Sequence, residues 1–123
     1  MTMEINNLTK FKIDKKSFSQ VAKKVLSGEN RRTATLSLVF VKKVEIKKLN
    51  KRFRNKNKAT DVLSFKLEEG KYLGEIVICP EMVKPEEMMK TFIHGILHLC
   101  GYDHEKSEKE AKTMEKKQEK YLK

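Results

Sequence analysis

All three histidines of this chain fall within one eleven-residue stretch, from His94 to His104. His94 and His98 are four residues apart, so on a helix they lie on one face, about one turn from each other. Gly101 can end that helix with a left-handed turn, which would bring His104 back toward the same point. We therefore expect His94, His98 and His104 to hold one metal ion, with the site on a helix and the turn after it.

Three imidazoles leave the fourth position of a tetrahedral ion open. Open sites are the catalytic kind, whereas structural zinc sites are closed by four protein ligands. The sequence thus predicts one catalytic zinc ion, with other divalent transition metals as alternatives, and a bound water whose pKa is roughly 7. Cys100 is a competing ligand by type. Its place between Leu99 and Gly101 at the apolar end of the helix favours packing instead.

The same stretch is similar to the zinc-protease pattern H-E-x-x-H-x-x-G-x-x-H, with one difference. Gly95 stands where the proteases have the glutamate that acts as general base. Without it, peptide hydrolysis lacks its proton acceptor. A glycine inside a helix costs about 1 kcal/mol relative to alanine, so Gly95 needs a local reason. Close approach of a strand or of a substrate backbone is one, and a tolerated packing glycine is the other.

The charge of the chain favours a polyanionic partner. The net charge is +11, which suits nucleic acid or an anionic membrane face. Between positions 42 and 58, lysines and arginines are opposed by one acid, Glu45. This basic ridge suits phosphate contacts, which are electrostatic and independent of sequence. The predicted nucleic-acid-binding residues are Lys47, Lys48, Lys51, Arg52 and Arg54. A solvated helix face is the alternative interpretation of the ridge.

Apolar periodicity predicts how the site is positioned. The expected strands are Met3–Leu8, Thr33–Val41, Asp61–Leu67 and Leu73–Cys79. Four helices are expected. The first follows an N-cap at Ser17 and ends near Gly28, and the second spans Lys42–Arg54. The third runs from Pro85 to about Cys100, and the fourth follows an N-cap at Ser107. A turn at Glu68–Lys71 makes the last two strands antiparallel. The expected fold is α+β, a small mixed sheet with helices packed on it, forming one domain over residues 1–123.

A reducing cytoplasm is the expected location. The two cysteines, Cys79 and Cys100, do not make a disulfide framework. The first ten residues contain no long apolar stretch typical of a signal peptide. The longest apolar runs are far too short to span a bilayer, so no membrane partner is expected.

Several motifs, in order along the chain, together resemble the YbeY family of bacterial ribosomal RNA maturation factors and metal-dependent endoribonucleases. The run His94–His104, H-G-I-L-H-L-C-G-Y-D-H, is similar to the family signature. Leu49–Arg54 resembles its L-N-x-x-[FY]-R helix, Thr60–Phe65 its T-D-V-L-S-F strand, and Leu73–Ile76 its L-G-[DE]-I strand. The chain departs from the family pattern at Ala59 and Lys66, where prolines are usual, and in a shorter stretch between Cys79 and Met88.

The resemblance implies a zinc-type ion on the three histidines and endonucleolytic cleavage of single-stranded RNA, not DNA. It also implies a role in 3′-end maturation of small-subunit ribosomal RNA and in ribosome quality control, with ribosomal RNA and the small subunit as partners. The family pattern has an arginine at Arg54, so we expect a catalytic role there, in which its planar guanidinium grips a phosphate. Asp103 either orients a metal ligand from the second shell or is a solvated carboxylate at the helix end.

Two other functions remain open from the residues alone. The first is a zinc metalloprotease-like hydrolase, which would need a base that position 95 does not supply. The second is a non-catalytic ribosome-assembly factor in which the metal has a structural role.

Overall fold

The computed structural model describes residues 2–123, apart from the side chains of residues 2, 68 and 69. Its elements follow the order β1 (Thr2–Asn7), α1 (Lys15–Gly28), β2 (Thr35–Phe40), α2 (Lys43–Arg54), β3 (Val62–Glu69), β4 (Tyr72–Ile78), α3 (Met88–Leu99) and α4 (Glu108–Leu122). Two short 3₁₀ turns, Pro80–Met82 and Pro85–Glu87, join β4 to α3. The predicted α+β class is confirmed.

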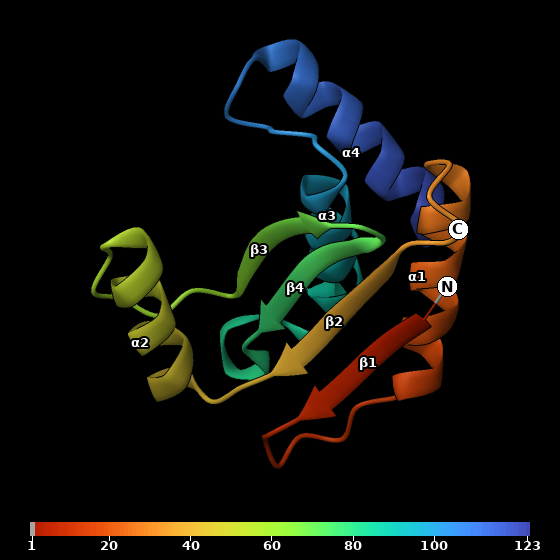
Figure 1. Ribbon diagram of the computed structural model, residues 1–123. Coiled ribbons are helices and arrows are strands. Elements are labelled where there is room, and N and C mark those ends of the chain that lie inside the picture. Colours follow the sequence, from red (N-terminus) through yellow and green to blue (C-terminus); the bar gives the residue numbers. More distant parts are fainter. Residues whose placement is uncertain (1) are drawn as a thin grey trace.

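The four strands form one mixed sheet in the order β1-β2-β4-β3. β1 is parallel to β2, and β2 is parallel to β4. β3 and β4 form the predicted antiparallel pair, with Val62 opposite Ile78 at one end. The predicted first strand is therefore an edge strand of the sheet (Figure 1).

Alternating side chains of the central strands serve two separate cores, because successive residues of a strand point to opposite faces. On one face, Leu36 and Ile76 join the large core formed with α1, α3 and α4. On the other face, Val77 and Cys79 pack with Ile46 of α2. Figure 1 shows α3 behind the sheet and α2 beside the ends of β2 and β3. The sheet thus lies between the helix that carries two histidines and the helix that carries the basic ridge.

Two predicted helix starts are wrong in detail, and one is right. α1 is capped by Asp14, not by Ser17, because the Asp14 carboxylate accepts from both the backbone and the hydroxyl of Ser17. The N-cap therefore lies three residues earlier than expected, and the helix begins at Lys15. Pro85 opens a 3₁₀ turn, and α3 begins only at Met88. Ser107 does cap α4, accepting from the Glu110 N–H at 3.0 Å.

Within residues 2–123, no helix has both the length and the apolar character that crossing a bilayer requires.

Candidate metal centre and nucleic-acid groove

A groove of about 1350 Å³ is lined by residues of α2, β3, α3, the segment after α3, and α4. His94, His98 and His104 all line it. Its basic lining residues are Arg52, Arg54, Lys56, Lys66 and Lys90. The structure therefore brings the three predicted metal ligands and part of the predicted basic ridge to one surface.

Close packing of α3 on the sheet accounts for Gly95. The apolar side of α3 is buried in the large core, and Gly95 lies at the contact with β3 and β4. A Cβ at position 95 would lie 3.2 Å from the Ser64 hydroxyl and 3.2 Å from a methyl of Ile76. Of the two expected reasons for this glycine, the approach of strands is thus the one that the structure supports. The glycine allows α3 to hold its two histidines over β3.

A hydrogen bond from α4 sets the tautomer of His94. Nδ1 of His94 lies 3.0 Å from Oε1 of Gln118. The Gln118 amide nitrogen donates to Glu115 at 3.3 Å, which orients the amide oxygen toward the ring. Nδ1 of His94 then donates, and Nε2 keeps a free lone pair for a metal. Burial also lowers the pKa of His94 below its usual 6.5, which favours the neutral ring that a metal requires.

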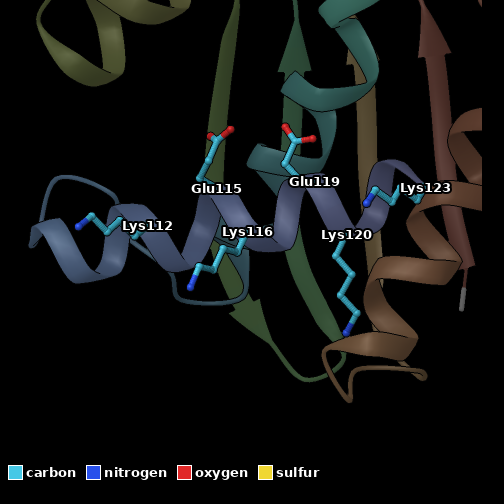
Figure 2. Close-up of a pocket in the computed structure, with 6 residues that line it drawn as sticks. All are labelled: Lys112, Glu115, Lys116, Glu119, Lys120 and Lys123. Carbon is cyan, nitrogen blue, oxygen red and sulfur yellow. The ribbon is translucent and has the colours of Figure 1, made fainter.

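The carboxylates behind this bond are themselves held by α3. Lys90 pairs with Glu115 at 3.0 Å and with Glu119 at 3.3 Å. Figure 2 shows Glu115 and Glu119 projecting from one side of α4, while Lys116 and Lys120 project from the other. The chain Lys90, Glu115, Gln118 and His94 therefore runs from α3 across α4 and back to α3.

The tautomer of His98 is set by the backbone. Its Nδ1 lies 2.9 Å from the carbonyl oxygen of Tyr102. Because a carbonyl only accepts, Nδ1 must donate, and Nε2 of His98 is again the free nitrogen. Gly101 has φ +109°, so the predicted left-handed turn after the helix is present. That turn places the Tyr102 carbonyl against His98.

A buried carboxylate at the end of α1 anchors Tyr102. The Glu29 side chain is only 6% exposed. One of its oxygens accepts from the Tyr102 hydroxyl at 2.7 Å, and the other accepts from Lys117 at 3.0 Å and from the Tyr121 hydroxyl. Burial works to raise the pKa of Glu29, but the three donors outweigh it and hold that pKa below the usual 4.5. Burial and the Glu29 charge raise the pKa of Tyr121 to about 12. This Glu29 clamp, formed with Tyr102, Lys117 and Tyr121, fixes α4 and the histidine segment to α1.

His104 approaches His94 but does not complete a ligand set. The two rings are edge-to-face with centroids 4.9 Å apart. Within residues 2–123, no three His, Cys, Asp or Glu side chains have the arrangement of metal ligands, so the three rings do not meet at one point here. The donor set nevertheless fits a zinc-type ion in chemistry, because imidazole nitrogens are preferred zinc ligands. Two of the three rings are also held in the required tautomer.

Only the C-terminal end of the predicted basic ridge lines the groove, and the middle of the ridge lies outside it. Arg52 and Arg54, at the end of α2, line the groove, whereas Lys47, Lys48 and Lys51 are exposed on α2 and do not. Arg54 makes no ion pair with any described residue. Buried Asn50 supports this end of the helix, because its amide donates to the Lys58 carbonyl at 2.9 Å.

Asp103 and Cys100 both lie next to the site. Asp103 lines the groove, and its Oδ1 accepts from the Glu105 N–H at 3.0 Å, within its own turn. Its role toward a metal ligand stays a prediction. Burial raises the pKa of Cys100 to about 11, which keeps its thiol protonated at neutral pH. That protonation disfavours the thiolate a metal would need.

Gln118, Tyr102 and Glu29 contribute to the site but were not predicted as site residues. Gln118 carried one usable signal, since it shares the apolar stripe of α4 with Met114 and Tyr121 at helical spacing. A polar residue on a buried stripe requires a partner. Glu29 and Tyr102 are 73 residues apart, and no local pattern connects them.

The fold and the groove together define a class: small α+β proteins in which three histidines and two arginines line one surface groove beside a mixed sheet. The model of the family described as "Endoribonuclease YbeY" matches residues 4–123. The chain therefore belongs to the YbeY family.

Individual relatives agree with this assignment. The chain is 47% identical, over 102 residues, to the endoribonuclease YbeY of Bdellovibrio bacteriovorus, and the match covers 75% of this chain and 67% of that protein. It is 42% identical to the endoribonuclease YbeY of Thermotoga maritima over 97 residues, covering 71% of this chain and 65% of the relative. The matched part thus spans about two thirds of the length of these relatives.

The fold has a solved counterpart. The chain is similar to the solution structure of TM1509 from Thermotoga maritima, with a TM-score of 0.68 and 33% sequence identity. The match covers 98% of this chain and 86% of that one.

Proposed function

We propose that this chain is a metal-dependent endoribonuclease that cuts single-stranded RNA. One observation carries the proposal: three histidines share a groove with Arg52 and Arg54. Family membership gives the reaction, since relatives at 42–47% identity are named endoribonuclease. The net charge of +11 suits a polyanionic substrate.

His94, His98 and His104 would hold one ion, for which zinc is our proposal, through imidazole nitrogens. When bound, that ion supplies Lewis-acid polarisation of the scissile phosphate and a water acidic enough to be hydroxide near neutral pH. Gln118 and the Tyr102 carbonyl hold the rings of His94 and His98 so that their Nε2 atoms remain free. Asp103 is proposed to support the ligands from the segment that carries His104.

Arg54 is proposed as the catalytic cation. It lines the groove without an ion pair to a described residue, so its guanidinium is available to a phosphate. A planar guanidinium can donate two parallel hydrogen bonds to phosphate oxygens. Charge that develops on the phosphorane oxygens would then be stabilised by a group already in place. Lys47, Lys48, Lys51 and Arg52 are proposed to bind the RNA backbone around the site.

The peptidase alternative is disfavoured by the packing at position 95. A peptidase of this pattern needs a carboxylate base next to its first histidine. A Cβ at Gly95 would press against Ser64 and Ile76, so a carboxylate base at that position would have to displace these neighbours.

The proposed biological role is 3′-end maturation of small-subunit ribosomal RNA and ribosome quality control. The proposed partners are ribosomal RNA and the small subunit. We place the chain in the cytoplasm, as one domain over residues 1–123 that binds neither membrane nor DNA. Both cysteines are free thiols in the structure, which agrees with a reducing compartment.

Cleavage assays test the proposal directly. Purified protein should cut a labelled single-stranded RNA, and a chelator should stop cleavage until metal is restored. The matched DNA strand and a casein substrate should stay intact. Loss of cleavage in His94→Ala with unchanged RNA binding would show that the histidine acts in the cleavage step and not in RNA binding. Metal-independent function of that variant in ribosome assembly, or efficient casein cleavage, would refute the nuclease proposal.

A further inference from the structure

One large apolar side chain on α2 is exposed inside the groove that holds the histidines. Among the described residues, the exposed large apolar side chains are Leu8, Phe11, Val44, Phe53, Leu67, Met82 and Leu122. Phe53 and Leu67 line the groove, and the other five do not. Isolated exposed apolar residues are ordinary on protein surfaces, so the location of Phe53 is the informative point. It is an aromatic ring, 57% exposed, in the groove that holds the histidines.

The ring of Phe53 has defined neighbours. Phe65 of β3 packs against it edge-to-face, with centroids 5.2 Å apart and an angle of 66° between the planes. The Arg52 guanidinium lies 5.2 Å from the ring centroid. The ring is therefore supported by the sheet and accompanied by a cation, while more than half of the side chain stays open to solvent.

We propose that Phe53 is a stacking platform for one unpaired nucleobase of the RNA, with Arg52 beside it. This inference rests on the proposed function and names the feature of the substrate that the groove recognises. Every base has a π-face, so an exposed aromatic ring binds bases with little regard to sequence. Phosphate contacts from lysines and arginines do not by themselves distinguish single strands from double strands, because both have the same backbone. Phe53 therefore gives the groove its preference for single strands, since a paired base is already stacked within its duplex.

The composition of the chain allows a direct optical test. The protein contains no tryptophan, so Phe53→Trp places the sole indole at the proposed platform. Val44→Trp is the matched control, because Val44 is 60% exposed on the same helix but does not line the groove. The probes are a short single-stranded RNA and an abasic strand of equal length and charge. Binding of each end-labelled strand is followed separately by fluorescence anisotropy.

The RNA should quench Phe53→Trp fluorescence along the same isotherm as the anisotropy change. The abasic strand should bind without quenching it, and neither strand should quench Val44→Trp. Phe53→Ala should weaken binding of the RNA about tenfold and leave binding of the abasic strand unchanged. Phe53→Trp that stays unquenched with RNA bound would refute the stacking platform and leave the nuclease proposal standing. Failure of the wild type to bind or cut any RNA would refute the proposed function instead.

Discussion

Nδ1 of His94 lies 3.0 Å from Oε1 of Gln118, a residue 24 positions further along the chain and on a different helix. A residue of α4 thus sets the orientation of a proposed metal ligand on α3. Groups that hold ligating histidines typically change metal affinity by 10–100-fold when removed. The Gln118 bond is therefore the first place to test how the fold controls the site.

Gln118→Ala should weaken metal binding by roughly 10–100-fold, because the His94 ring loses the acceptor that sets its tautomer. Gln118→Glu should retain most of the affinity, since a carboxylate also accepts from Nδ1. Competition with a chromogenic chelator measures both. Glu119→Gln is the control, because it breaks one pair with Lys90 but leaves the Gln118 amide in place. Equal affinity in Gln118→Ala and the wild type would show that this bond does not position the ligand.

Tyr102→Phe and Tyr121→Phe form a matched pair. Each removes one hydroxyl that donates to the Glu29 carboxylate, and each should cost about 1.5 kcal/mol of unfolding free energy. Only Tyr102 also carries the carbonyl that accepts from His98. Tyr102→Phe keeps this backbone carbonyl, but it releases the segment that carries the carbonyl from Glu29. It should therefore weaken metal binding as well, whereas Tyr121→Phe should not. Denaturant unfolding and chelator competition separate the two effects, and equal metal affinities would contradict the link between the clamp and His98.

Glu29→Gln tests the clamp by pH. The Glu29 pKa is lowered in the fold, so its ionised form stabilises the protein above about pH 4.5, and this stability is lost as pH falls through the lower folded pKa. The variant should be less stable than the wild type near pH 7, by about 1–3 kcal/mol, and the difference should shrink as the pH falls below about 4.5. Urea unfolding at several pH values gives the comparison. A difference that stays constant with pH would mean that the charge of Glu29 does not matter.

Arg54→Ala and Lys51→Ala should have different phenotypes. Lys51 lies outside the groove, so its loss should weaken RNA binding modestly and reduce the salt slope by roughly one unit. If Arg54 meets charge that develops only in the transition state, Arg54→Ala should slow cleavage roughly a hundredfold with little change in affinity. Arg54→Lys should rescue poorly. Single-turnover cleavage and binding titrations at several salt concentrations distinguish the two, and small equal losses would reduce Arg54 to a surface cation.

Sequence patterns with a short range located most of the fold. Strand and helix periodicities found all eight main elements, and Gly101 and Ser107 ended and began helices as expected. Asp14 was missed as a cap because Ser17 is also a good N-cap residue, and only the structure shows which of the two accepts. Local patterns carry no information to choose between them.

The site was only partly predictable, because its support is long-range. Helical spacing predicted that His94 and His98 share one face, and the turn at Gly101 predicted that His104 approaches them. Lys47, Lys48 and Lys51 do not line the groove. A helix exposes its charges on several sides, and only the packing decides which side faces α3. Glu29 and Gln118 reach the site only through the packing of α1 and α4 against α3.

Metal stoichiometry tests the central claim most directly. Elemental analysis of purified wild-type protein should give about one transition-metal ion per chain. His94→Ala, His98→Ala and His104→Ala should each lose tight binding, and the triple variant should carry none while remaining folded by circular dichroism. One equivalent of metal still bound to the folded triple variant would contradict the account, because the three histidines would then not be the ligands.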